Sequence, residues 1–219
     1  MNIANKIKGF SQNSQIIIKN TIGAFIIRGL SLIVSVLTTP AFIYYFNNNE
    51  VLGIWFTMLS ILIWFLNFDL GIGNGLRNQL VKDFTHKDYG SVNCTLSSGF
   101  LSTGVVTIIL TLLGCLLISV VNLNQLFNVD EHLLSHETLV MSSLAIFIGL
   151  MLRFFLTTIT SIFYALQKSA VNNFLGLCIA ILQLLYVKLF HFDDVNEAMI
   201  NLAVAYVIIS NLPTVIAGI

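Results

Sequence analysis

The sequence predicts an all-α fold, a polytopic membrane helix bundle of about six transmembrane helices. Hydrophobic residues make up 57% of the 219 residues and charged residues only 9%, with a mean hydropathy of +0.90. Such a composition is typical of an integral membrane protein and not of a soluble domain around a buried core. The apolar residues also gather into six runs, each long enough to cross the roughly 30 Å hydrocarbon layer of a bilayer as a helix.

Residues 1–20 precede the first run and are predicted to form an amphipathic helix on the cytosolic membrane surface. Ile3, Ile7 and Phe10 fall on one side of a helical wheel, opposite Lys8, and such lysines are attracted to anionic lipids. A partly disordered tail is the alternative. The remaining residues, 21–219, are predicted to form one six-helix transmembrane lobe. Its spans are expected at about 21–46, 51–70, 92–121, 138–166, 171–190 and 198–219.

Lysine and arginine residues in the short loops predict the orientation of the spans. They occur before the first span and in the second and fourth loops, whereas the first, third and fifth loops are polar or acidic and contain no Lys or Arg. The N-terminus is therefore expected in the cytosol. Lys188, near the outer end of the fifth span, is interpreted as a lysine that extends its ammonium group to the membrane surface. The loop and N-terminal cations are Lys6, Lys8, Lys19, Arg77, Lys82, Lys87 and Lys168.

The fourth span carries an arginine, Arg153, about halfway along its length. A charge at the middle of a bilayer is costly and needs a functional reason. At 100° per residue, Arg153 lies in a polar stripe, while the opposite face of the helix is Leu, Phe, Met and Ile. We expect this stripe to face other helices or a water-filled cavity. It consists of Ser142, Gly149, Arg153, Thr157, Thr160 and Tyr164.

The first span carries a second polar stripe, which contains Arg28. Arg28 lies about two turns inside the cytosolic boundary and Arg153 about twice as deep, so the two cations are expected to line one path toward the middle of the membrane. The alternatives for Arg28 are a side chain extended to the surface or an ion pair with Asp69. For Arg153 the alternative is a hydrogen bond to carbonyl groups of a neighbouring helix or to Gln183. The second stripe consists of Thr21, Ala24, Arg28, Ser31, Ser35 and Thr39.

No other acidic residue is expected at the depth of Arg153, so its counter-ion is predicted to be an anionic ligand. A guanidinium suits phosphate, since its planar fork binds two oxygens at once and stays charged. Asp69 is predicted to act in ion coupling or to form a structural ion pair with Arg28. No motif with a full set of metal ligands is present, and we expect neither a metal nor a cofactor. The residues predicted to line the cavity are Ser31, Ser35, Thr39, Thr157, Thr160, Tyr164 and Asn211.

Three alternating glycines, Gly71, Gly73 and Gly75, follow the second span. Their spacing is not that of a nucleotide-binding loop, and no strand precedes them, so a flexible turn into a cytosolic surface helix is predicted. This region carries a family resemblance. Leu52-Gly53-Ile54-Trp55-Phe56, with Leu59-Ser60, and Phe68-Asp69-Leu70-Gly71-Ile72-Gly73-Asn74-Gly75-Leu76-Arg77-Asn78 closely resemble the second span and following loop of bacterial O-antigen and capsule-repeat flippases. These flippases belong to the multidrug/oligosaccharidyl-lipid/polysaccharide exporter superfamily.

The resemblance implies a transporter that moves undecaprenyl-diphosphate-linked oligosaccharide repeat units across the bacterial inner membrane by alternating access, for O-antigen or capsule synthesis. In such proteins two six-helix lobes face each other across a cationic cavity whose arginines neutralise the lipid diphosphate. That role is expected here for Arg28 and Arg153. The expected partners are the lipid-linked oligosaccharide and membrane lipids, with no nucleic acid.

The resemblance covers only the N-terminal lobe of such a flippase. We therefore expect a second chain or a further C-terminal lobe to supply the other half, or the chain to be an inactive fragment. A cation-coupled multidrug or metabolite exporter of the same superfamily is the alternative, and it would need a buried carboxylate, for which Asp69 is the candidate. A membrane enzyme acting on lipid-linked sugars would rely on Asp193 and Asp194. These two are predicted to be a solvated acidic loop, and no enzymatic activity is expected.

Overall fold

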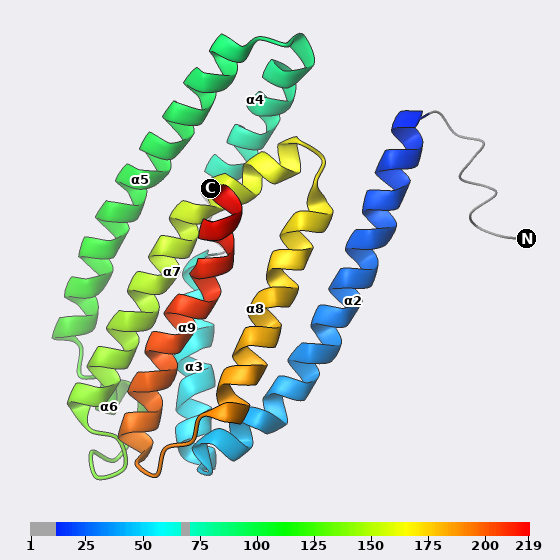
Figure 1. Ribbon diagram of the computed structural model, residues 1–219. Coiled ribbons are helices and arrows are strands. Elements are labelled where there is room, and N and C mark those ends of the chain that lie inside the picture. The colour runs from blue at the N-terminus through cyan, green and yellow to red at the C-terminus, as the bar shows by residue number, and fades with distance from the viewer. Residues whose placement is uncertain (1–11, 67–70) are drawn as a thin grey trace, which may run out of the picture.

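The computed structural model describes residues 12–66 and 71–219, which form eight helices, and these ranges contain no strand (Figure 1). The predicted all-α fold is therefore confirmed. The helices are α2 (Gln12–Phe46), α3 (Asn49–Leu66), α4 (Ile72–His86), α5 (Tyr89–Val120), α6 (Leu123–Phe127), α7 (His136–Ala165), α8 (Ser169–Leu189) and α9 (Val195–Gly218).

Five of the described helices are long and apolar enough to cross a membrane: α2 from Thr21 onward, α5, α7, α8 and α9. The 18-residue α3 corresponds to the predicted second span and is apolar from Asn49 to Ile61. Together they form the expected polytopic bundle of about six helices. The last residues of the predicted second span, including Asp69, lie outside the described residues.

The first helix is longer than its predicted span. α2 begins at Gln12 and continues without interruption to Phe46, so residues 12–20 belong to the same helix as the first span. No glycine or proline separates the two parts, which explains why the helix does not break there. Residues 1–11 lie outside the described residues, and a position of this segment on the membrane surface stays a prediction.

Helix α4 follows the glycine-rich segment. Gly71 precedes it in the left-handed conformation, with φ of 76°, which strains any residue with a β-carbon. The helix predicted after the turn is present, but it packs along α5 and α7 and does not lie apart from the bundle (Figure 1). Leu76 and Leu80 are buried there against Val92 and Ala165. Packing on α5 and α7 therefore fixes α4 alongside these two helices.

Helix α7 is the central helix of the bundle. It packs most extensively on α9, α5 and α4, and it also contacts α3, α6 and α8. Glycines permit the close approach: Gly114 of α5 lies against the ring of Phe147, and Gly149 of α7 lies against Val207 of α9. Small residues at a contact let helix backbones come close together in membrane proteins. Arg153 is thus carried by the helix with the most neighbours.

Helix α2 packs chiefly on α8 and has fewer contacts with α3 and α9. One link is a hydrogen bond from Asn173 Nδ2 of α8 to the Ala24 carbonyl oxygen, 3.0 Å long. The last turn of α2 enters the main core, where the Tyr45 hydroxyl donates to the Ala198 carbonyl oxygen at 2.9 Å. The first bond joins α2 to α8, and the second holds this pair against α9.

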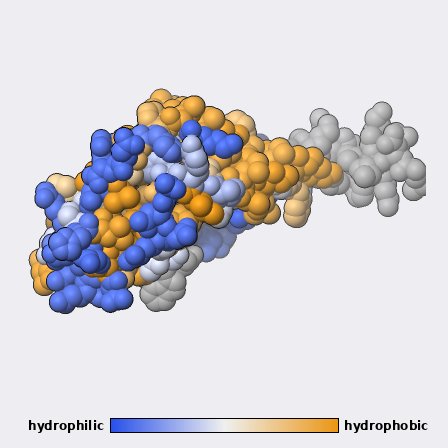
Figure 2. Space-filling model, turned by 90° about the horizontal axis from the view of Figure 1, so that it is seen from below, coloured by the Kyte–Doolittle hydropathy of each residue, from blue (hydrophilic) through white to orange (hydrophobic). Residues whose placement is uncertain are grey.

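The alternating helices bring the loops to two ends with different charges (Figure 1). We call one the basic end, defined by Arg77, Lys82, Lys87 and Lys168 at the α4–α5 and α7–α8 connections. The other, the acidic end, shows several blue hydrophilic patches among hydrophobic areas in Figure 2. Which membrane face each end meets stays a prediction. The acidic end is defined by Glu50, Asp130, Glu131, Glu137, Asp193, Asp194 and Glu197.

Two loop aspartates cap the helices that follow them. Asp88 accepts hydrogen bonds from the Ser91 N–H at 3.0 Å and the Ser91 hydroxyl at 2.8 Å. These bonds lower the pKa of the Asp88 carboxyl below its usual value, because they stabilise the ionised form. Asp194 accepts from the Asn196 N–H at 3.2 Å and caps α9. Asp193 and Asp194 are both exposed, as predicted for a solvated acidic loop.

Candidate functional site

Arg153 is partly buried between α7 and α9. One of its guanidinium N–H groups donates to the Ser210 carbonyl oxygen of α9, and Tyr206 of α9 lies near enough to interact with its charge. Within residues 12–66 and 71–219 no carboxylate forms an ion pair with it. The carbonyl hydrogen bond is one of the alternatives left open by the sequence. It occupies one of five guanidinium donors and neutralises no charge.

A groove lies between α2, α3, α8 and α9, and Arg153 is not one of its lining residues. Its volume is about 240 Å³, and Tyr206, the neighbour of Arg153, forms part of its wall. We call it the inner groove. Its polar residues come mainly from α2 and α8, and its apolar residues mainly from α3. The lining residues are Ser35, Thr38, Thr39, Phe42, Phe56, Leu59, Ile63, Ala180, Gln183 and Tyr206.

The hydroxyl groups of α2 present acceptors to the inner groove. Ser35 donates to the Ser31 carbonyl oxygen at 2.9 Å, and Thr38 donates to the Val34 carbonyl oxygen at 2.7 Å. A hydroxyl that donates within its own helix still has lone pairs to accept a hydrogen bond. The groove can therefore accept hydrogen bonds from the hydroxyl groups of a ligand. Ser35 and Thr39, two of the residues predicted to line the transport cavity, are in the wall of this groove together with Thr38 and Gln183.

Arg28 lies on the same face of α2 as Ser35. Seven residues separate the two, which places Arg28 about 10 Å nearer to the basic end. Its side chain is exposed, whereas Ser31, one turn further along, is buried. Arg28 is thus on the approach to the inner groove and not in its wall. Ser31 does not line the groove, because it is packed within the bundle.

Residues of the polar stripe of α7 form hydrogen bonds within the helix or contacts with a neighbouring helix. Thr157 and Thr160 donate to carbonyl oxygens one turn earlier in α7, Phe154 and Thr157. The ring of Tyr164 lies 5.5 Å from the guanidinium carbon of Arg77, a cation–π contact that joins α4 to α7. None of these three residues lines the inner groove. Thr157 and Thr160 are partly buried and Tyr164 is exposed, and a cavity-lining role of these three residues stays a prediction.

Asn211 also has a packing role. It is 4% exposed, and its amide nitrogen donates to the Gly149 carbonyl oxygen of α7 at 2.9 Å. It therefore bridges α7 and α9 beside the close contact of Gly149 with Val207. Asn211 thus lies at the α7–α9 interface, and a cavity-lining role for it stays a prediction. The close approach of α7 and α9 at Gly149 brings the Gly149 carbonyl within hydrogen-bonding distance of the Asn211 amide.

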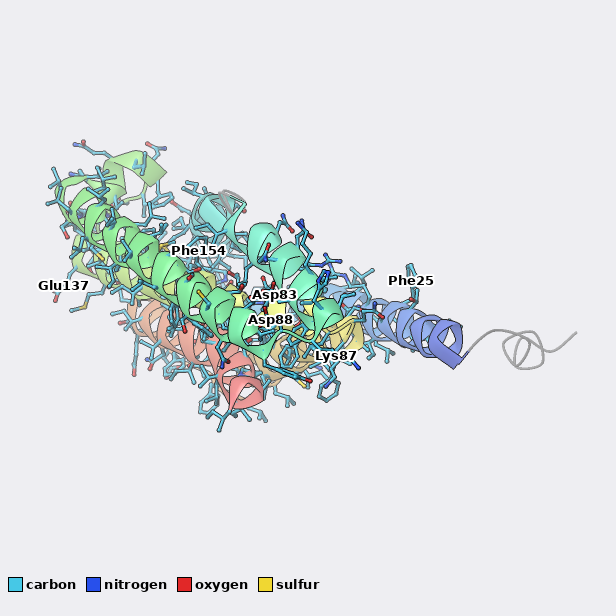
Figure 3. The ribbon with its side chains drawn as sticks, turned by 90° about the horizontal axis from the view of Figure 1, so that it is seen from above. Phe25, Asp83, Lys87, Asp88, Glu137 and Phe154 are labelled. Atoms are coloured by element: carbon cyan, nitrogen blue, oxygen red, sulfur yellow. The ribbon has the colours of Figure 1, made fainter. Side chains whose placement is uncertain are left out.

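One buried carboxylate was missed in the sequence. Asp83 of α4 is 6% exposed and lies where α4 runs beside α5 (Figure 3). It accepts hydrogen bonds from Gln79 Nε2 at 2.9 Å and from the Thr95 hydroxyl at 2.6 Å. Gln79 and Thr95 line a cavity of about 290 Å³ between α4 and α5. The spacing of Leu76, Leu80 and Asp83 on one helical face was the available signal.

The inner groove presents hydroxyl and amide groups, and Arg153 presents a guanidinium at the α7–α9 contact. Asp83 marks a second polar position, nearer to the basic end. Asp69, the other predicted functional carboxylate, lies outside the described residues. Comparisons with protein-family models, curated proteins and solved structures find no match to this chain.

Proposed function

We propose that this chain is part of a flippase that moves undecaprenyl-diphosphate-linked oligosaccharide repeat units across the bacterial inner membrane. The observation that supports it most is Arg153, a guanidinium on a membrane-spanning helix with a carbonyl partner and no carboxylate among the described residues. The family resemblance of residues 52–60 and 68–78 supports the same proposal. In the proposed flippase, the basic end faces the cytosol.

The charge of Arg153 is the physical basis of this function. A buried cation without an anionic partner is unfavourable in a bilayer, and a diphosphate entering from the basic end relieves that cost. Four guanidinium N–H groups remain for phosphate oxygens after the bond to Ser210. Arg28, exposed nearer to the basic end, provides a first contact for the same head group. The oligosaccharide hydroxyls then lie against the inner groove.

The rest of the ligand has a place in this arrangement. The polyprenyl chain stays in lipid, because the exposed faces of the spanning helices are apolar. The described helices provide one wall of the transport path, and the proposal includes a second lobe that provides the opposite wall. Alternating access then moves the diphosphate past the middle of the membrane while Arg153 holds it.

Binding of undecaprenyl diphosphate tests the role of Arg153 directly. We expect the purified protein in lipid nanodiscs to bind undecaprenyl diphosphate more tightly than undecaprenol, which lacks phosphate. R153A is expected to weaken this binding about tenfold or more, because hydrogen bonds to charged groups are lost. R153K keeps the charge without the planar fork, so its affinity for undecaprenyl diphosphate is expected to lie between those of R153A and the unchanged protein.

K168A is the matched control, since Lys168 is an exposed cation in the α7–α8 connection. It is expected to leave the dissociation constant unchanged. Equal binding of undecaprenyl diphosphate by folded R153A and the unchanged protein would refute the diphosphate role of Arg153.

Asp83 favours a second candidate, a cation-coupled multidrug or metabolite exporter. A buried carboxylate hydrogen-bonded to a hydroxyl and an amide can carry a proton or a sodium ion, and Asp83 has these partners. For such an exporter, cells expressing the protein should extrude ethidium, and D83N should abolish the extrusion. D130N, which changes an exposed acid at the other end, should retain it. If the unchanged protein extrudes no ethidium, this candidate is rejected for that substrate class.

A further inference from the structure

The α2–α8 pair has two different sides. On α2, Ser35, Thr38, Thr39 and Phe42 face the inner groove. Leu37, Pro40, Ala41 and Tyr44 lie about half a turn away around the same helix, so they share the opposite face. The side chain of Tyr44 is 69% exposed and that of Leu37 is 53% exposed. This second side therefore faces the lipid in a membrane-embedded protein.

A second groove lies on the lipid-facing side, near the acidic end. Its volume is about 450 Å³, and we call it the lateral groove. Four lining residues, Leu37, Pro40, Ala41 and Val187, are apolar, and they run inward from the helix ends for about 10 Å. The remaining two, Tyr44 and Lys188, lie within one turn of the ends of α2 and α8. The groove is thus apolar at depth and polar at its rim.

The rim carries an unpaired cation. Lys188 is exposed and forms no hydrogen bond or ion pair with the described residues. It is the one lysine or arginine near the acidic end within the described ranges. Tyr44 lies beside it in the groove, and the ring of His191 lies 4.7 Å from the Tyr44 ring. A cation, a phenol and an imidazole at the membrane–water boundary can all donate to phosphate oxygens.

We propose that the lateral groove binds one phospholipid molecule with a zwitterionic head group. Its acyl chain lies against Leu37, Pro40 and Val187, and its phosphate contacts Lys188. The lipid then bridges α2 and α8 on the side away from the inner groove. This site is distinct from the proposed diphosphate site, and it does not depend on what the protein transports.

Charge at the acidic end argues for a head group that carries an amine as well as a phosphate. The carboxylates Asp193, Asp194 and Glu197 follow Lys188 in the loop and first turn that connect α8 to α9. They repel a head group with net negative charge and attract an ammonium group. Phosphatidylethanolamine carries both charges, so it matches Lys188 and these acids together.

Native mass spectrometry of the delipidated protein tests this proposal. Dioleoyl-phosphatidylethanolamine, dioleoyl-phosphatidylglycerol and dioleoylglycerol share their acyl chains and differ only in the head group. We expect one phosphatidylethanolamine molecule to bind most tightly. K188Q is expected to raise its dissociation constant about fivefold, as for the loss of one lysine near a phosphate. K168Q removes an exposed lysine at the basic end. It is expected to leave the dissociation constant of phosphatidylethanolamine unchanged.

A second variant tests the groove itself. L37W fills the lateral groove with a larger side chain at an exposed position, so it is expected to weaken binding without altering the core. Equal affinity of K188Q and the unchanged protein, or of dioleoylglycerol and phosphatidylethanolamine, would overturn the phosphate contact. Tighter binding of phosphatidylglycerol than of phosphatidylethanolamine would overturn the zwitterionic assignment.

Discussion

In the organism that encodes this chain, a chromosomal R153A substitution is expected to abolish surface polysaccharide, whereas R153K is expected to leave a reduced amount. Alanine removes the one arginine of the central helix α7, which contains no lysine. Lysine keeps a positive charge at the same depth but cannot bind two phosphate oxygens through a planar fork. The measurement is the amount of cell-surface polysaccharide on a gel, at equal protein level by immunoblot.

A structural role of Arg153 predicts a different result. Its one hydrogen bond joins α7 to the Ser210 carbonyl of α9, and such bonds between membrane helices contribute roughly 1–2 kcal/mol at most. R153A protein should therefore keep a melting temperature within a few degrees of the unchanged protein. Normal polysaccharide in R153A cells at equal protein level would remove the main support for the flippase proposal.

Gly114→Ala is expected to cause the largest loss of stability among simple substitutions in the bundle. A β-carbon at this position of α5 would lie 2.1 Å from ring atoms of Phe147 on α7, and Phe147 is itself 4% exposed. Because the Phe147 side chain is buried, either its ring or helix α5 must shift to make room for the β-carbon. Overpacking of this kind costs about 1–3 kcal/mol and occasionally more. Monomer recovery after heating in detergent, followed by size-exclusion chromatography, measures it.

Gly104→Ala is the matched control on the same helix. Its β-carbon would lie 3.6 Å from the Phe155 ring of α7, an ordinary van der Waals distance. It is expected to leave stability unchanged or to raise it slightly, since alanine favours helix more than glycine does. The double variant G114A/F147L is expected to recover part of the loss. Equal stability of G114A and G104A would show that α5 does not pack on α7 in this register.

Most of the fold could be predicted because hydrophobicity alone determines which segments enter a membrane. The end of α2 at Phe46 and the course of α7 over His136–Ala165 follow closely from the apolar runs. Helix α4 is harder to predict, because Asn74, Arg77 and Lys82 make its composition polar. Its packing on α5 and α7 depends on a narrow apolar face, which composition does not reveal.

The candidate site was predicted less completely than the fold. The depth of Arg153 follows from counting residues along a helix, and so does the face shared by Arg28 and Ser35. What a polar residue contacts depends instead on how the neighbouring helices rotate and approach. Asn211 bonds to the Gly149 carbonyl because Gly149 permits close contact with α9. No pattern within one helix predicts that pairing.

The pairing of α2 with α8 has a consequence for biosynthesis. α8 begins at Ser169, 123 residues after α2 ends at Phe46, so at about 5–20 residues per second the ribosome needs roughly 6 to 25 s to reach the start of α8. Until then, the nascent first helix must reside in lipid without its chief neighbour. The Ser35 and Thr38 hydroxyls bond to carbonyls of their own helix. These bonds lower the free-energy cost of placing the two hydroxyl groups in lipid. Insertion of the first helix is therefore expected to precede assembly of the bundle.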